Sequence, residues 1–142
     1  MNDYNFKIEN AENQTDIIQF LDDKIYEYNS SIINQHNGKL FAKIIRDEKG
    51  IVIAGISGWS WAKVSEITLL WVREENRKNG FGKMLLQAAE DEMVKEGCRT
   101  ILLRSYSFQA PLFYESNGYK IAYVMDDFPN GYKHYTLVKR IK

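Results

Sequence analysis

A change in hydrophobic period between residues 72 and 81 constrains the fold more than any other feature of this chain. Before it, Leu40–Arg46, Ile51–Trp59 and Glu66–Val72 are rich in β-branched and aromatic residues, and short turns separate them. This is typical of antiparallel strands. After it, apolar residues recur at helical spacing from Phe81 to Lys95, and Gly97 follows as it does at many helix ends. The pattern predicts a meander of strands followed by a helix.

The rest of the chain adds elements on both sides of this pattern. Apolar residues at helical spacing between Ile17 and Ile32 predict an amphipathic helix, and Tyr4–Glu9 alternates as a strand does. The elements expected after Gly97 are the strand Thr100–Arg104, the short helix Phe108–Glu115, and the strand pair Tyr119–Met125 and Tyr132–Val138. We therefore expect one α/β (α+β) domain over residues 1–142, with a mixed, mostly antiparallel sheet of about six or seven strands flanked by helices.

Composition argues against several classes of function. Lys plus Arg and Asp plus Glu both number 19, so the net charge is zero, and nothing favours nucleic acid or an anionic membrane as the partner. The apolar runs are too short to cross a bilayer. Cys98 is the single cysteine, and neither His36 nor His134 has metal-ligand spacing with it. We expect a cytoplasmic protein without a disulfide, a metal site or a signal peptide.

A pair of glycines lies where the predicted helix begins. The stretch RKNGFGKML, residues 77–85, places Gly80 and Gly82 directly after the basic residues Arg77 and Lys78. The first turn of a helix has unpaired backbone N–H groups, and glycine lets an anion approach them closely. These residues predict either a cradle for a phosphate or pyrophosphate, or a simple tight turn. The spacing differs from the P-loop and from the dinucleotide-binding fingerprint, so nucleotide hydrolysis and nicotinamide binding are disfavoured.

Two motifs, in the right order, resemble the GNAT superfamily of N-acetyltransferases. Residues 77–82, Arg-Lys-Asn-Gly-Phe-Gly, match that family's R-x-x-G-x-G motif. Further on, SFQAPLFYESNGYKIAY is similar to a helix of this family, with Ala110, Tyr114, Gly118 and Tyr119 matching A-x-x-x-Y-x-x-x-G-[FY]. The similarity extends from about Leu40 to the C-terminus and agrees with the order of elements predicted above.

The resemblance implies a site for acetyl-CoA as the acetyl donor. Backbone N–H groups from Arg77 to Lys83 would bind the pyrophosphate, and the edge of Leu70–Val72 would pair with the pantetheine arm like a further strand. The residues expected to contact acetyl-CoA are Leu70, Trp71, Val72, Arg77, Lys78, Asn79, Gly80, Phe81, Gly82, Lys83 and Ser107. Ser107 stands where the family has asparagine, so Gln109 is an alternative for that contact. Lys78 stands where the family often has glycine.

The resemblance also implies residues for proton transfer. Tyr114 matches the family's tyrosine and would act as general acid toward the leaving thiolate. Glu66, at the start of the central strand, would act as general base through water, with an ordinary solvated carboxylate as the alternative. Thr68, two residues further along and on the same face, and a chain of waters are the other candidates for the base.

We therefore expect an N-acetyltransferase that moves acetyl from acetyl-CoA to a primary amine by direct attack. The resemblance allows small amines, polyamines, amino acids, aminoglycosides and peptides as acceptors, and the neutral charge favours a small molecule. The rival hypothesis is a non-catalytic acyl-CoA sensor or interaction module on the same fold. The resemblance also implies a possible homodimer, which is common in the family.

Overall fold

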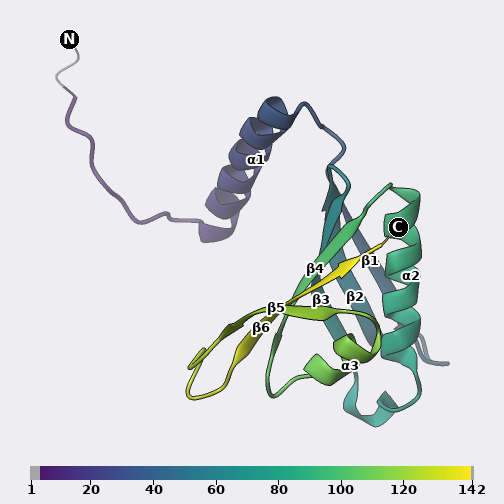
Figure 1. The fold of residues 1–142 in the computed structure, drawn as a ribbon. Helices are drawn as coiled ribbons and strands as arrows, with labels where there is room; N and C mark the ends of the chain where they lie inside the picture. The colour runs from purple at the N-terminus through teal and green to yellow at the C-terminus, as the bar shows by residue number, and fades with distance from the viewer. Residues whose placement is uncertain (1–3, 142) are drawn as a thin grey trace. The chain divides into compact units, whose positions relative to one another are not determined.

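The structure, a computed structural model, describes residues 4–141, which fall into two compact units with a boundary between His36 and Asn37. The first unit contains the helix α1 (Gln14–Ile33) (Figure 1). The Asn13 side chain caps this helix by accepting a hydrogen bond from the Asp16 N–H at 3.1 Å. Asn34 ends it in the left-handed region with φ 59°. The predicted helix is thus confirmed.

The strand predicted at Tyr4–Glu9 is wrong. Residues 4–11 adopt neither helix nor strand. An alternating pattern becomes a strand only where a neighbouring strand completes the ladder of backbone hydrogen bonds. Within the first unit, residues 4–36 as described contain no other strand that could pair with this segment.

The second unit is built on a six-stranded sheet. Its strands are β1 (Lys39–Arg46), β2 (Val52–Trp61), β3 (Val64–Val72), β4 (Thr100–Tyr106), β5 (Lys120–Met125) and β6 (His134–Arg140). They lie in the order β1-β2-β3-β4-β6-β5, and only β3 and β4 are parallel neighbours (Figure 1). The predicted mixed, mostly antiparallel sheet is confirmed. Among residues 4–141, no helix is long and apolar enough to cross a membrane.

Turn residues set the ends of several elements. Gly50 takes φ +81° in the loop between β1 and β2. Ala62 and Lys63 both take positive φ in the two-residue turn between β2 and β3, as a tight hairpin requires. The helix α3 (Pro111–Ser116) begins later than the predicted start at Phe108. Proline is suited to the first turn of a helix because it has no N–H that would be left unpaired there.

The helix α2 (Phe81–Lys95), predicted with the same bounds, covers one face of the sheet (Figure 1). Its buried residues Leu85, Leu86, Ala89 and Met93 belong to one core with buried strand residues, among them Ile56, Ile67, Leu103 and Leu137. An ion pair between Lys43 and Glu92, at 2.9 Å, also joins α2 to β1. Burying one side chain of this size contributes about 1.5–3 kcal/mol. The core therefore holds the start of α2 in a defined place beside the strands.

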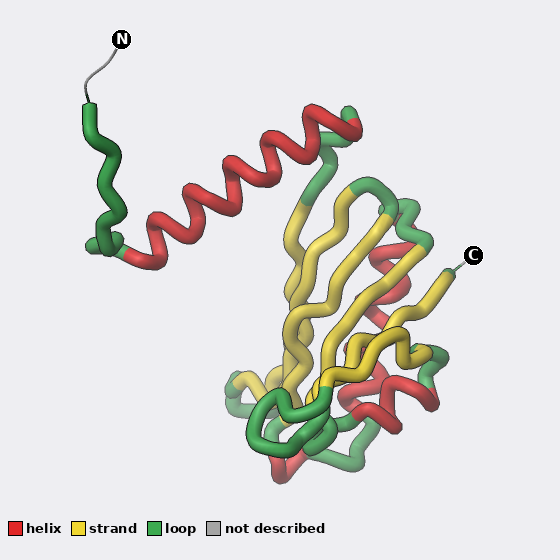
Figure 2. The backbone as a smooth tube through the Cα atoms, turned by 60° about the vertical axis from the view of Figure 1, so that its left-hand side comes forward, coloured by secondary structure: helices red, strands yellow, loops and turns green. Residues whose placement is uncertain are grey.

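The sheet opens between its two parallel strands. β3 and β4 pair only where Val64–Ile67 faces Thr100–Leu103, although β3 continues to Val72 and β4 to Tyr106. Beyond the paired stretch the two strands diverge, and Figure 2 shows the sheet from a second side. The divergence leaves backbone groups of both strands without a partner strand between them.

A β-bulge lies next to this opening. Ser57 and Gly58 of β2 pair with Leu69 and Ile67 of β3, so Thr68 is the extra residue between them. Gly58 has to be glycine here, because a Cβ would lie 2.1 Å from the Glu66 carbonyl oxygen. The bulge bends β3 at the residue where it leaves β4.

Candidate active site

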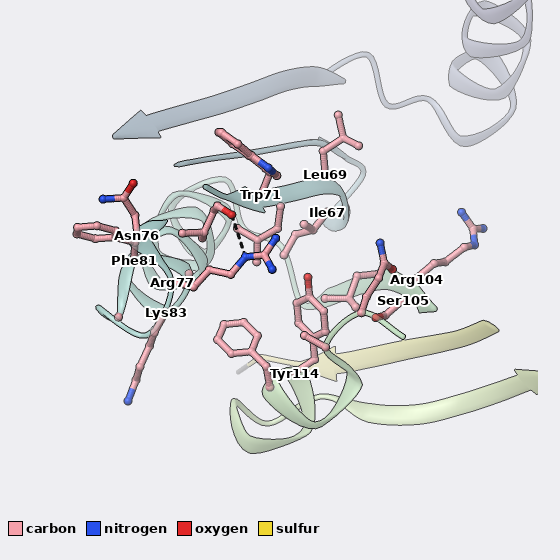
Figure 3. A pocket seen from close by; sticks show the side chains of 18 of the residues that line it. Ile67, Leu69, Trp71, Asn76, Arg77, Phe81, Lys83, Arg104, Ser105 and Tyr114 are labelled. Atoms are coloured by element: carbon pink, nitrogen blue, oxygen red, sulfur yellow. Dashed lines mark hydrogen bonds between the residues drawn. The ribbon is translucent and has the colours of Figure 1, made fainter. Parts of the chain in front are cut away.

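A cavity of about 800 Å³ lies where β3 and β4 separate. Its walls are the ends of both strands, the loop before α2 with the first turn of that helix, and α3. Figure 3 shows Tyr114 pointing into the cavity from α3 and Arg77 pointing into it from the loop. The predicted site residues that line it are Leu70, Trp71, Val72, Arg77, Lys78, Gly80, Phe81, Gly82, Lys83 and Tyr114. Glu66, Asn79 and Ser107 lie outside the lining.

The backbone at the start of α2 presents a run of free hydrogen-bond donors. In the part of the chain that the structure describes, the N–H groups of residues 78–83 have no hydrogen-bond partner. The flanking N–H groups of Arg77 and Met84 bond to the carbonyls of Glu74 and Gly80 at 3.2 and 3.0 Å. Successive free donors at the positive end of a helix dipole are suited to an anion.

Lys78, in this loop, has a backbone conformation that is unfavourable for a residue with a side chain. Its φ of +67° costs a residue that has a Cβ about 1–2 kcal/mol. We expect Lys78→Gly to raise the free energy of unfolding by up to about 1 kcal/mol, because glycine removes the strain but adds entropy to the unfolded chain. Urea unfolding measures this. The affinity for acetyl-CoA, the ligand that the family resemblance implies, should fall no more than about fivefold in a calorimetric titration, since only an exposed charge is lost. A loss above roughly fiftyfold would show that the Lys78 ammonium is the main anion ligand.

The end of β3 offers its backbone to the cavity. Because β3 bonds to β2 on one side only, half of its N–H and C=O groups between Thr68 and Val72 point toward the gap. One of the carbonyls, that of Val72, accepts a hydrogen bond from Arg77 Nε at 3.2 Å (dashed in Figure 3). An extended ligand can pair with such an edge as a further strand does.

Tyr114 places a free hydroxyl in the cavity. Its ring is half-buried and packs edge-on against Phe113 and Tyr119, with centroids 5.2 and 6.0 Å away. Among the described residues its hydroxyl has no hydrogen-bond partner, and burial raises the pKa of Tyr114 above the ordinary tyrosine value. The phenol therefore keeps its proton at neutral pH and can donate it to a group bound in the cavity.

Glu66 is held by two donors from neighbouring strands. The Trp59 indole Nε1–H donates to one carboxylate oxygen at 3.2 Å, and Arg104 Nη1 donates to the other at 2.7 Å. The Glu66 side chain is only 16% exposed. Arg104 lines the cavity whereas Glu66 does not, so Glu66 can act on a bound group only through Arg104 or through water.

Thr68 lines the cavity next to Glu66 in sequence. Its hydroxyl lies 3.2 Å from the hydroxyl of Ser57, and either oxygen can be the donor. The bulge makes this contact because it places Thr68 beside Ser57. Two adjoining hydroxyls at a cavity wall can pass a proton toward solvent.

Gln109, and not Ser107, lines the cavity. The Ser107 hydroxyl accepts a hydrogen bond from the Lys133 N–H at 3.0 Å, and the Ser107 N–H donates to the Lys133 carbonyl at 2.8 Å. These bonds tie the segment after β4 to the loop before β6. The Gln109 side-chain oxygen accepts from the Tyr106 N–H at 2.8 Å, which leaves the side-chain amide NH₂ as a donor for a ligand.

Sequence reasoning missed several residues of the lining, both apolar and polar. Among them are Asn76, Arg104, Ser105 and Phe108. A signal for two of them was present, since Arg104 and Ser105 interrupt an otherwise apolar strand near its end, where polar side chains often mark a site rather than a core. Asn76 ends the short 3-10 helix Glu74–Asn76 that precedes the loop, and its local sequence carries no comparable signal.

Comparison with known proteins identifies the family. The sequence profile of the acetyltransferase (GNAT) family matches residues 5–119. The chain belongs to this family. Blasticidin-S acetyltransferase of Streptomyces morookaense is 34% identical over 107 residues, which span 72% of this chain and 76% of that relative. The family and this relative make the chain an N-acetyltransferase, and acetyl-CoA is the acetyl donor typical of the family.

Solved structures of acetyltransferases share its fold. An acetyltransferase from Bacillus cereus is 32% identical, with a TM-score of 0.81 over 96% of this chain and 98% of that one. A candidate acetyltransferase from Agrobacterium tumefaciens is 23% identical, with a TM-score of 0.84 over 97% and 100% of the two chains. The GNAT-like fold predicted from the two motifs is therefore confirmed.

Proposed function

We propose that this GNAT enzyme transfers the acetyl group of acetyl-CoA to a primary amine of a small molecule by direct attack, without a covalent enzyme intermediate. One observation carries the proposal: a single cavity joins the free backbone donors of Lys78 and residues 80–83, the open edge of β3 and the hydroxyl of Tyr114. A pyrophosphate, an extended pantetheine arm and a leaving thiolate need these three features along one path.

Each part of the cavity has a separate task in this proposal. The N–H groups of residues 78–83 hold the pyrophosphate, and Arg77 adds a positive charge beside them. The edge of β3 at Leu70–Val72 pairs with the pantetheine arm, and backbone donors there polarise the thioester carbonyl. Gln109 takes the polar contact for which Ser107 was the other candidate, because Gln109 lines the cavity.

Two proton transfers accompany the reaction. Tyr114 gives its proton to the departing thiolate, for which a phenol that stays neutral is suited. The ammonium of the acceptor has to lose a proton before it attacks, and we assign this proton to Glu66 through water. Each of the two Glu66 carboxylate oxygens accepts one hydrogen bond and keeps a second lone pair that can accept another. The hydroxyls of Thr68 and Ser57 are the second candidate route, since Thr68 lines the cavity.

A small-molecule acceptor is supported by the relative named for blasticidin-S and by the zero net charge of the chain. One observation favours the second candidate, a non-catalytic acyl-CoA sensor: both oxygens of Glu66 are engaged by Trp59 and Arg104. A single functional domain, a homodimer and a cytoplasmic location stay predictions.

Tyr114→Phe tests the catalytic part of the proposal. Phenylalanine keeps the ring packing on Phe113 and Tyr119 but removes the proton donor. We expect kcat to fall by about 100-fold, a typical contribution of one general acid, while the Kd for acetyl-CoA stays within about threefold. Release of free thiol across an amine screen measures the rate, and calorimetric titration measures the affinity.

Tyr135→Phe is the matched control, since Tyr135 is also half-buried and packs against the same core. It should leave kcat within about twofold of the wild type. Equal turnover in wild type and Tyr114→Phe would remove Tyr114 from the mechanism. Tight acetyl-CoA binding with no thiol release above the buffer rate for any amine would favour the sensor.

A further inference from the structure

Five aromatic rings gather at one side of the cavity. Tyr106, Phe108, Phe128, Tyr132 and His134 are called the ring cluster here. Tyr106 and Phe108 stack with centroids 5.1 Å apart and planes within 4°, and Tyr132 meets Phe108 edge-on at 5.0 Å. The His134 ring lies 4.7 Å from Tyr106 and 5.2 Å from Phe128. The rings come from the end of β4, the segment after it, and the loop that leads into β6.

Backbone bonds hold these segments together before any ligand binds. Tyr106 pairs with His134 in the β4–β6 ladder, and Ser107 bonds twice to Lys133. Inside the loop, the Phe128 N–H donates to the Tyr132 carbonyl at 2.8 Å. The rings are therefore prearranged, which lowers the entropy lost when a ligand binds to them.

Folding leaves much of the ring cluster in contact with solvent. Phe108, Tyr132 and Phe128 are 57%, 50% and 46% exposed. Rings that served only to stabilise the loop would gain more by packing fully, whereas grouped rings with exposed faces are a common ligand-binding surface. The exposed parts of these three rings are open to contact with a further ring.

The ring cluster is continuous with the cavity. Phe108 lines the cavity together with Arg104 and Gln109. Along β4, Leu103 and Ser105 are buried, so the alternating Arg104 and Tyr106 side chains lie on the opposite face of the sheet from α2. The free backbone N–H donors at the start of α2 border the same cavity. A molecule on the ring cluster would approach this cavity from the side of β4. Figures 1 and 2 show the β5–β6 loop at the end of the sheet where α3 lies.

We propose that the ring cluster binds the acceptor and selects an amine attached to a flat aromatic or heteroaromatic ring. The faces of Phe108, Tyr132 and Phe128 can stack with such a ring, which brings its amine to the cavity that Phe108 lines. A saturated ring of the same size cannot lie flat against them, and a linear polyamine covers them poorly. This inference rests on the proposed function, since it names the substrate class of the same site.

The test compares 2-phenylethylamine with 2-cyclohexylethylamine, which have equal reach and differ in the flatness of the ring. Saturation-transfer NMR with the full chain and acetyl-CoA measures binding, and thiol release measures kcat/KM. We expect the phenyl compound to bind, and to react, about tenfold better than the cyclohexyl compound. Tyr132→Leu and Phe128→Leu should each reduce this preference to within about threefold.

Tyr123→Leu is the matched control, because Tyr123 lies on the same hairpin, is 59% exposed and has no ring contact among the described residues. It should keep the tenfold preference. Equal binding of the two amines to the wild type would overturn the inference, as would an equal loss of preference in all three variants. Preferential binding without thiol release would keep the ring cluster as a binding surface and count against the proposed transfer, so the two failures are distinguishable.

Discussion

Gly82→Asp should abolish acetyl-CoA binding while the fold stays intact. A Cβ at Gly82 would lie 3.5 Å from the Phe113 ring and 3.9 Å from the Val72 side chain, which are ordinary contact distances, so an aspartate fits. Its carboxylate would stand in the cavity wall in the first turn of α2, where we propose that the pyrophosphate binds. Like charges a few ångströms apart in a partly dehydrated site repel by several kcal/mol. We expect Kd to rise by about 1000-fold or more.

Gly82→Ala separates charge from bulk in this experiment. It makes the same new Cβ contacts without a carboxylate, and it should bind acetyl-CoA within about tenfold of the wild type in calorimetric titration. An acidic residue in the first turn of a helix is favourable by about 0.3–1 kcal/mol, so Gly82→Asp should unfold at a urea concentration no lower than the wild type. Binding by Gly82→Asp within tenfold of the wild type would mean that the anion lies elsewhere.

Local signals predicted the start of α2 and the loop before it. Gly80 and Gly82 indicate a backbone that turns and whose N–H groups no side chain covers. The helical period starts at Phe81, where the helix begins. Such features depend on a few neighbouring residues, so a single sequence carries them. The same holds for the hairpin at Gly50, whose positive φ follows from its place in a tight turn.

Features that depend on pairing between strands far apart in the sequence could not be predicted from such local signals. Tyr4–Glu9 has the alternation of a strand but no partner strand in its unit, and it adopts no strand. The bond between Glu66 and Arg104 exists because the parallel stretch of β3 and β4 places Glu66 opposite Leu102, and no local pattern encodes that register. Sequence reasoning therefore found Glu66 but missed the cation that holds it.

The ring cluster could not be predicted from the sequence for the same reason. Its members come from residue 106 to residue 134 and meet only because β4 and β6 are neighbours in the sheet. The choice between Ser107 and Gln109 also depended on tertiary structure, since the Lys133 backbone engages Ser107 and leaves Gln109 at the cavity. Family motifs predicted the acetyl-CoA half of the proposed site, because backbone conformation at a short stretch of sequence determines that half. They predicted little of the acceptor half, which is formed by side chains from segments far apart in the sequence.

A buried ion pair links the core to the helix that carries Tyr114. Lys139 Nζ of β6 lies 2.9 Å from a carboxylate oxygen of Glu90 of α2, and their side chains are 24% and 8% exposed. The same ammonium donates to the Asn117 carbonyl, at the end of α3, at 2.9 Å. The Tyr119 hydroxyl donates to Glu90 at 2.9 Å. Burial, with the Glu90 charge as a second cause, raises the pKa of Tyr119, so this hydroxyl stays a donor.

Lys139→Met should lower the free energy of unfolding by about 3–5 kcal/mol, because it leaves the Glu90 carboxylate buried without its cation. It also frees the Asn117 carbonyl at the end of α3. Urea unfolding with the full chain measures the loss. The exposed pair Arg73–Glu75, at 3.2 Å with Glu75 74% exposed, supplies the control: Glu75→Gln should change the same free energy by less than about 1 kcal/mol.

The double variant Glu90→Gln with Lys139→Met distinguishes two causes of the stability loss in Lys139→Met, namely loss of the charge partner and loss of packing. Glutamine keeps an acceptor for the Tyr119 hydroxyl and removes the buried charge, so it should recover at least about half of the stability that Lys139→Met loses. If the double variant is less stable than Lys139→Met alone, the loss comes from packing and hydrogen bonds at Lys139 rather than from an unpaired carboxylate. Both variants lack the Lys139 ammonium that bonds the Asn117 carbonyl at the end of α3, so recovery of stability without recovery of kcat would place Lys139 among the residues that position Tyr114.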